Sequence, residues 1–232
     1  MASKRTRRRA RRKPRRRFRR KKAPIVNFTP GRTTDLALNA LCKFRYVTEG
    51  SFTAGVGVPY NTYQFRMNGP YDPDYTGTGH QPPNFDNLMN MYLRYRVYKV
   101  TAKVTFINTA SHAQRVALYG RRTTTTESNP LLHDLAVDRK CTMATLTPAT
   151  GSKNIVTLRK TFYPGTFYKG ENYAKDIAFS GTGSNVPSSQ CYINLGVYSL
   201  DKTTQATINY EVDLIYHTRL ERISEVEMVL ED

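Results

Sequence analysis

The first 22 residues have the side-chain types and the density suited to one kind of chemistry, the binding of phosphate. Fifteen of them are Lys or Arg and none is acidic. Arg predominates, and its guanidinium group can bind two phosphate oxygens at once. Phe18 can stack on an unpaired base. The predicted nucleic-acid-binding residues are Lys4, Arg5, Arg7, Arg8, Arg9, Arg11, Arg12, Lys13, Arg15, Arg16, Arg17, Phe18, Arg19, Arg20, Lys21 and Lys22.

The positive charge of the chain is concentrated in this arm. The chain has 36 basic and 18 acidic side chains, for a net charge of +18. Residues 23–232 alone have 21 basic and 18 acidic side chains, for a net charge of +3. The arm has almost nothing to bury and its charges repel, so we expect it to be disordered alone. A solvated tail or a nuclear import signal has a similar composition. Fifteen charges exceed what import requires, which favours the coating of a polyanion, with import as a second role.

The sequence offers no pattern typical of a catalytic, metal or cofactor site. A phosphate-binding GxxxxGK[ST] loop is absent. The four histidines are scattered, and none stands at metal-ligand spacing from a Cys or another His. Asp72 and Asp74, with Asp86 nearby, offer oxygen ligands for a cation, but Asp beside Pro73 is more typical of a turn. We therefore expect no enzyme, no catalytic residue, no metal and no cofactor.

The cysteines and the lengths of the apolar runs indicate in which cellular compartment the protein is expected. Cys42, Cys141 and Cys191 are odd in number and far apart, which favours buried thiols in a reducing compartment over disulfides. No apolar run approaches the ~18 residues of a membrane span. The basic N-terminus lacks the apolar stretch of a signal peptide, so we expect neither secretion nor membrane insertion.

Alternating apolar and polar residues predict a series of strands over the body of the chain. In the first, Leu36, Leu38, Ala40, Cys42, Phe44 and Tyr46 form the buried face, and in the third the buried face is Tyr98, Val100, Ala102, Val104 and Phe106. One or two helical turns are expected at 84–92, with Asn84 as a candidate cap. The predicted strands are 35–46, 60–67, 98–106, 113–121, 141–146, 154–162, 191–198 and 206–216.

Eight strands with hardly any helix exclude a parallel α/β sheet, and the long connections favour Greek-key wiring. The predicted fold is therefore all-β, an eight-stranded antiparallel jelly-roll sandwich with a disordered basic N-terminal arm. Long polar loops are expected at 68–84, 123–138 and 180–189, the last two as candidates for surface display. The predicted organisation is an arm at 1–22, a linker at 23–34, a jelly-roll domain at 35–220 and an acidic tail at 221–232.

Three segments carry a resemblance to a known family. They are the basic arm at 5–22, the block at 68–108 with Gly79-His80-Gln81-Pro82 and Tyr95-Arg96-Val97, and the final strand at 207–221. In these segments the chain resembles the capsid proteins of circovirus-like viruses, the small eukaryotic viruses whose circular single-stranded DNA encodes a replication initiator. The block at 68–108 is the most specific of the three.

The resemblance implies an eight-stranded jelly roll in a sixty-subunit (T=1) icosahedral shell. It also implies that the arm binds the single-stranded DNA genome inside the shell and contains a nuclear localisation signal. The partners would then be other copies of the chain, the genome, host nuclear import receptors and a host-cell receptor of unknown identity, and the locations the virion and the host nucleus. Two alternatives stay open: a cellular nucleic-acid-binding protein with a basic tail, and a capsid of a small single-stranded RNA virus. Phosphate neutralisation does not distinguish DNA from RNA.

Overall fold

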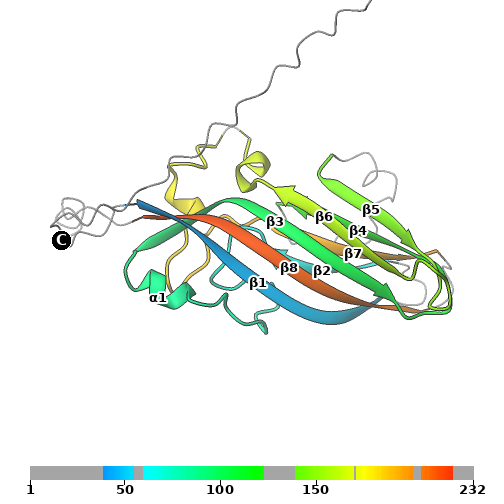
Figure 1. The fold of residues 1–232 in the computed structure, drawn as a ribbon. Helices are drawn as coiled ribbons and strands as arrows, with labels where there is room; N and C mark the ends of the chain where they lie inside the picture. Colours follow the sequence, from blue (N-terminus) through cyan, green and yellow to red (C-terminus); the bar gives the residue numbers. More distant parts are fainter. Residues whose placement is uncertain (1–38, 55–59, 123–138, 170, 201–204, 222–232) are drawn as a thin grey trace, which may run out of the picture. The chain divides into compact units, whose positions relative to one another are not determined.

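The computed structural model describes residues 39–54, 60–122, 139–169, 171–200 and 205–221. All of these described residues belong to one compact unit. Within the described ranges eight strands form two four-stranded antiparallel sheets (Figure 1). The strands are β1 (Asn39–Ala54), β2 (Tyr60–Arg66), β3 (Arg94–Asn108), β4 (Gln114–Arg121), β5 (Cys141–Leu146), β6 (Ile155–Phe162), β7 (Tyr192–Ser199) and β8 (Ala206–Glu221).

The order of the strands identifies the topology. One sheet has the order β1-β8-β3-β6 and the other β2-β7-β4-β5, so every connection except that from β4 to β5 crosses between the sheets. Crossing connections between two antiparallel sheets of four strands are the wiring of a jelly roll. The predicted all-β jelly-roll fold is therefore confirmed. Helix is limited to α1 (Phe85–Met89) and two single 3₁₀ turns, Pro164–Phe167 and Ile177–Phe179, among the described residues.

The core lies between the inward faces of the two sheets. Phe44 and Tyr46 of β1 are buried, as the alternation predicts, and so are Val100, Ala102, Val104 and Phe106 of β3. Ala40 and Cys42 pack partly buried at the margin of this core, whereas Leu36 and Leu38 lie outside the described residues. Tyr216 of β8 is fully buried, and its hydroxyl donates to the Arg66 carbonyl of the facing sheet at 2.8 Å.

Tyr98 does not belong to the buried face, and here the prediction was wrong. Its side chain is 43% exposed. The pairing of β3 with β8 shifts register between Val97 and Lys99, which marks a β-bulge. A bulge adds one unpaired residue and reverses the alternation beyond it, so a period-two pattern cannot be extended through it. Val97 is buried, while Tyr98 stands on the solvent side.

Asn84 takes the position expected of a helix cap without acting as one. It precedes α1 with a left-handed backbone (φ 63°), and its side chain makes no capping hydrogen bond. A capping side chain normally extends from β-region backbone, which this φ excludes. Three strands also run further than predicted, β1 to Ala54, β3 from Arg94 and β8 to Glu221. The strand β8 thus includes the first residue of the predicted acidic tail.

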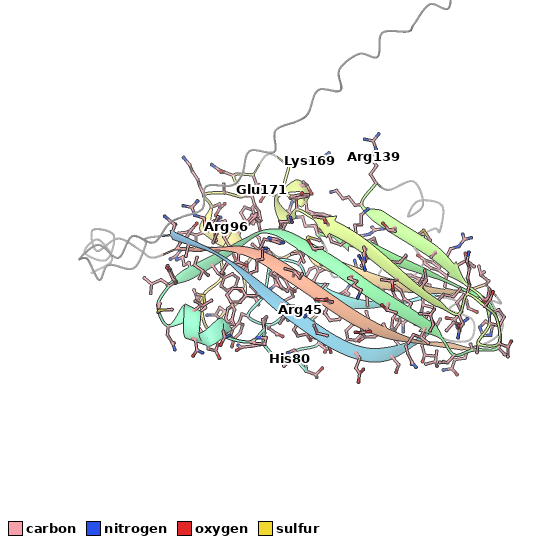
Figure 2. The ribbon with its side chains drawn as sticks, in the orientation of Figure 1. Arg45, His80, Arg96, Arg139, Lys169 and Glu171 are labelled. Carbon is pink, nitrogen blue, oxygen red and sulfur yellow. The ribbon has the colours of Figure 1, made fainter. Side chains whose placement is uncertain are left out.

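Arg96 connects the bulged part of β3 to the segment 172–179. Its side chain is 6% exposed, and one guanidinium nitrogen donates to the carbonyls of Tyr173 at 2.5 Å and Asp176 at 2.7 Å. Its Nε lies 3.8 Å from a carboxylate oxygen of Glu221. Figure 2 shows Arg96 at this end of the sheet. The guanidinium group therefore joins three segments that are far apart in sequence.

Replacing Arg96 by Met is expected to lower the free energy of unfolding by about 2–4 kcal/mol. The substitution keeps much of the apolar stem but leaves the carbonyls of Tyr173 and Asp176 without their donor. Arg94→Met is the control, since Arg94 is only half-buried and the change should stay within about 0.5 kcal/mol. Urea denaturation of both variants checks this, and equal stabilities would contradict the role given to Arg96.

Candidate nucleic-acid interface

The predicted binding residues of the arm, from Lys4 to Lys22, lie outside the residues that the structure describes. The same holds for the predicted display loop at 123–138. The loop at 180–189 is described, and at Gly181 its backbone exchanges two hydrogen bonds with Tyr95. A Cβ atom on Gly181 would clash with the Tyr95 ring, so this close approach requires glycine. That end of the loop is thus held against β3.

The described residues add a basic surface that was not predicted from the sequence. It lies on the outward face of the sheet β1-β8-β3-β6. Across three neighbouring strands, Lys43 pairs with His217, and His217 pairs with Lys99. Four residues further along, Lys103 of β3 stands opposite Arg159 of β6. We call Lys43, Lys99, Lys103, Arg159 and His217 the basic face.

Two acidic residues of this sheet, Asp213 and Glu221, are paired with arginines outside the basic face. Asp213 stands opposite Lys103 in the register, yet it takes a two-pronged interaction with Arg45 of β1, at 2.8 and 3.0 Å. Figure 2 labels Arg45 where β1 and β8 run side by side. Glu221 pairs with Arg219 at 3.3 Å. Within the described ranges none of the four cations of the basic face, Lys43, Lys99, Lys103 and Arg159, forms an ion pair.

His217 reports on the electrostatics of this surface. Partial burial lowers its pKa below the ordinary value of 6.5, and the charges of Lys99 and Lys43 lower it further. The Tyr98 ring approaches the imidazole edge-on, with 6.0 Å between ring centroids. A depressed histidine pKa means that the unfolded chain binds more protons, so this group lowers stability as the pH falls below about 6.5.

Replacing Lys99 by Gln is expected to raise the pKa of His217, because one of the two cations that oppose its protonation is removed. An NMR titration of the imidazole protons measures the shift. Lys153→Gln is the control, because Lys153 is exposed in the turn between β5 and β6 and should leave the titration unchanged. An unchanged pKa in Lys99→Gln would contradict the close approach of the two side chains.

The outward face of the sheet β2-β7-β4-β5 has a cluster of buried tyrosines. Tyr60, Tyr119 and Tyr198 form a buried cluster there with Ala117. The hydroxyls of Tyr60 and Tyr119 share a short hydrogen bond. Burial raises the pKa of all three phenols. This face therefore buries neutral aromatic groups, whereas the outward face of the sheet β1-β8-β3-β6 exposes cations.

The carboxylates that offered cation ligands are engaged by protein groups. Asp74 is buried and accepts hydrogen bonds from the Tyr63 hydroxyl at 2.7 Å and from both the backbone and the hydroxyl of Thr76. Asp72 forms an ion pair with Arg66 at 2.7 Å. In the described part of the chain no group of three or more His, Cys, Asp or Glu side chains is arranged to hold a metal. The two Asp residues thus organise the segment 68–84.

His80 fixes the same segment to the edge strand β1. Its Nε2 lies 2.9 Å from the Val47 carbonyl, and its ring centroid lies 4.7 Å from that of Tyr46. Figure 2 shows His80 beside β1. A Cβ atom at Gly79 would meet the Tyr46 hydroxyl at 2.7 Å, so the chain passes too close to β1 for a larger residue. The His80 ring therefore has a structural role here.

Cys42, Cys141 and Cys191 form no disulfide within the described residues. Cys191 is buried, whereas Cys42 and Cys141 are half-buried. Burial raises the pKa of the Cys42 thiol to about 11 and that of Cys191 to about 12. A nucleophilic cysteine needs a lowered pKa, so these two thiols are poor nucleophiles at neutral pH. No helix among the described residues is long and apolar enough to cross a membrane.

Comparison with known proteins finds remote matches among solved structures only. No family profile and no curated protein sequence matches the chain. Among solved structures, the BFDV capsid protein is 12% identical, with a TM-score of 0.39 over 79% of this chain and 100% of that one. The Mud crab tombus-like virus structure is 10% identical, with a TM-score of 0.39 over 93% and 97%. A human norovirus GI.7 particle structure is 14% identical, with a TM-score of 0.45 over 75% of this chain and 31% of that one.

Proposed function

We propose that this chain is the capsid protein of a small icosahedral virus of the circovirus-like kind. In this proposal the jelly-roll body assembles with copies of itself into a closed shell, and the basic arm binds circular single-stranded DNA inside it. The arm also serves as a nuclear localisation signal that host import receptors recognise. The virion and the host nucleus are then the locations of the protein.

One observation carries the proposal: the charge is divided between two parts of the chain. The arm holds fifteen cations, and the rest of the chain has a net charge of only +3. The arm is suited to neutralise phosphates without reading bases, because release of condensed counterions drives such binding. The near-neutral body can pack against copies of itself without strong mutual repulsion.

Charge arithmetic favours many copies acting together. Sixty subunits in a closed shell would bring about 900 arm charges into one interior, enough to neutralise on the order of half or more of a genome of one to two thousand nucleotides. A jelly roll suits this task, because double-sheet folds of this kind recur in viral shells. The high charge density of the arm is better explained by many arms acting together in a symmetric shell than by a single arm that binds nucleic acid alone.

Two other functions are less well supported. A cellular nucleic-acid-binding protein usually carries its main basic surface on the fold, whereas here the larger charge lies on the arm. A capsid of a single-stranded RNA virus would share both the arm and the jelly roll. The preference for DNA rests on the resemblance of residues 68–108 to circovirus-like capsids.

Expression of the full chain, followed by sedimentation and electron microscopy, tests the proposal. The expected result is closed particles that protect nucleic acid from added nuclease. Digesting the contents of virions with DNase and RNase then decides the type of genome, and DNase-sensitive, single-stranded contents are expected. If the contents are sensitive to RNase, the packaged genome is RNA and not DNA. A chain that stays a monodisperse monomer across salt and pH would contradict the proposed shell.

A further inference from the structure

We infer that the basic face of the jelly roll is a second nucleic-acid contact, which binds the phosphates of the single strand packaged by the arm. The inference rests on the proposed function and adds to it the side of the body that faces the genome. It assigns an interaction to Lys43, Lys99, Lys103, Arg159 and His217, all of which lie within the fold rather than in the arm.

The four cations of the basic face are not neutralised by ion pairs within the described ranges, and Asp213 and Glu221 of the same sheet pair with other residues. Glu49 and Glu211 lie opposite each other further along β1 and β8, and within the described ranges neither pairs with a cation of the basic face. Because Lys43 and Lys99 lie two strands apart, their Cα atoms are separated by about 10 Å, and Lys99 and Lys103 lie about 13 Å apart along β3. Several phosphates of one strand can therefore contact the face together.

Two exposed aromatic residues, Tyr98 and Tyr163, lie close in the sheet register to Lys99. Tyr98 is 43% exposed at the bulge next to Lys99, and its ring meets His217. Tyr163 is 51% exposed and directly follows Phe162, which pairs with Val100. Cations interleaved with exposed aromatic rings are the usual surface for single-stranded nucleic acid, since bases stack on the rings while the backbone meets the charges.

Threonine hydroxyl groups flank Lys103 and Arg159 on both sides. Thr101 and Thr105 of β3 pair with Thr161 and Thr157 of β6, on the same outward face as Lys103 and Arg159. The hydroxyls of Thr105 and Thr157 lie 3.0 Å apart. Hydroxyl groups of Thr are frequent donors to phosphate and sugar oxygens. On the outward face of the opposite sheet, Arg115 instead donates to the Thr145 hydroxyl at 3.3 Å, and the tyrosines are buried.

The test is a salt titration of the full chain with a fluorescently labelled single-stranded DNA oligonucleotide. The variant Lys43→Gln/Lys99→Gln/Lys103→Gln removes three cations of the basic face. Its charge-matched control, Arg115→Gln/Arg139→Gln/Lys153→Gln, removes three cations outside that face. All six side chains are at least partly exposed, so both variants should fold, which circular dichroism and thermal unfolding verify.

If the basic face binds phosphate, its variant loses about two units from the slope of log K against log salt, since each contact with a single strand contributes ~0.7. The affinity at 0.15 M salt then falls about 50-fold if binding at 1 M is unchanged. The control should match the wild type. If the slope of log K against log salt in the basic-face variant equals that of the wild type, the inference is overturned. The basic face would then bind a protein partner, such as the acidic residues 221–232 of another copy.

Particle formation is scored separately, by electron microscopy of the same three proteins. Failure of the wild type to form particles would overturn the proposed shell, while the slopes would still report whether the basic face binds nucleic acid. Normal particles together with unchanged slopes would overturn the basic face alone. The two failures are therefore distinguishable.

Discussion

Deletion of residues 1–22 is expected to reduce the affinity of the chain for single-stranded DNA by at least three orders of magnitude at 0.15 M salt. The deletion removes fifteen cations. If most of them contact phosphates, log K for the full chain falls with log salt with a slope of about −10, and the truncated chain retains only the shallow slope of the body. Fluorescence anisotropy over a range of salt concentrations measures both slopes.

The deletion should not change the stability of the body. The core residues, from Phe44 to Leu220, lie within the one compact unit of the described residues. A matched control replaces every Arg of the arm by Lys, which keeps the charges but removes the forked donors. That variant should retain the slope of about −10. Equal slopes for the full and truncated chains would place the binding on the body and contradict the role of the arm.

Replacing Tyr216 by Ala is expected to cost about 3–5 kcal/mol of unfolding free energy, a larger loss than that expected for Arg96→Met. The side chain is fully buried between the sheets, and its loss leaves a cavity of aromatic size. Total stabilities of about 5–15 kcal/mol make this a large fraction of what holds the fold together. Urea denaturation measures the loss.

Tyr216→Phe separates the hydrogen bond from the packing. It removes only the hydroxyl that donates to the Arg66 carbonyl, and the expected cost is about 0.5–1.5 kcal/mol, the usual net contribution of one hydrogen bond. Tyr163→Ala, at an exposed site, should change stability by less than about 0.5 kcal/mol. Similar losses in all three variants would contradict a core centred on β8.

The pH dependence of Tyr216 has a definite sign. Burial raises the pKa of its hydroxyl well above the ordinary value of 10. The unfolded chain therefore loses this proton first, so the contribution of Tyr216 is complete below pH 10 and is lost as the pH rises above it. Unfolding free energies measured between pH 8 and 11 should fall less steeply for Tyr216→Phe than for the wild type.

Local sequence patterns suffice for most of the fold because each strand has one buried and one solvated face. The alternation of Val100, Ala102, Val104 and Phe106 identifies β3 and its inward face. The same pattern fails at Tyr98, where the bulge depends on pairing with β8, a strand more than a hundred residues away. The ends of β1 and β8 likewise depend on their mutual pairing along all sixteen residues of each strand.

The basic face shows what local patterns leave out. Lys43 and Lys99 are each visible in the sequence as polar residues of an alternating strand, and neither is unusual alone. They come together only because β8 lies between β1 and β3, so that His217 pairs with both. Strand order in a jelly roll is set by long-range pairing, and it could not be read from the two segments separately.

In the proposed function the jelly roll forms the capsid shell and the arm binds the packaged nucleic acid. Sedimentation velocity recorded at 260 and 280 nm, on the full chain and on residues 23–232, tests it most directly. The account predicts nucleic-acid-filled particles of about sixty subunits from the full chain, and empty shells or free subunits from the truncated one. Monodisperse monomers from both proteins at every salt concentration, near the 26.5 kDa of a single chain for the full-length protein, would contradict it.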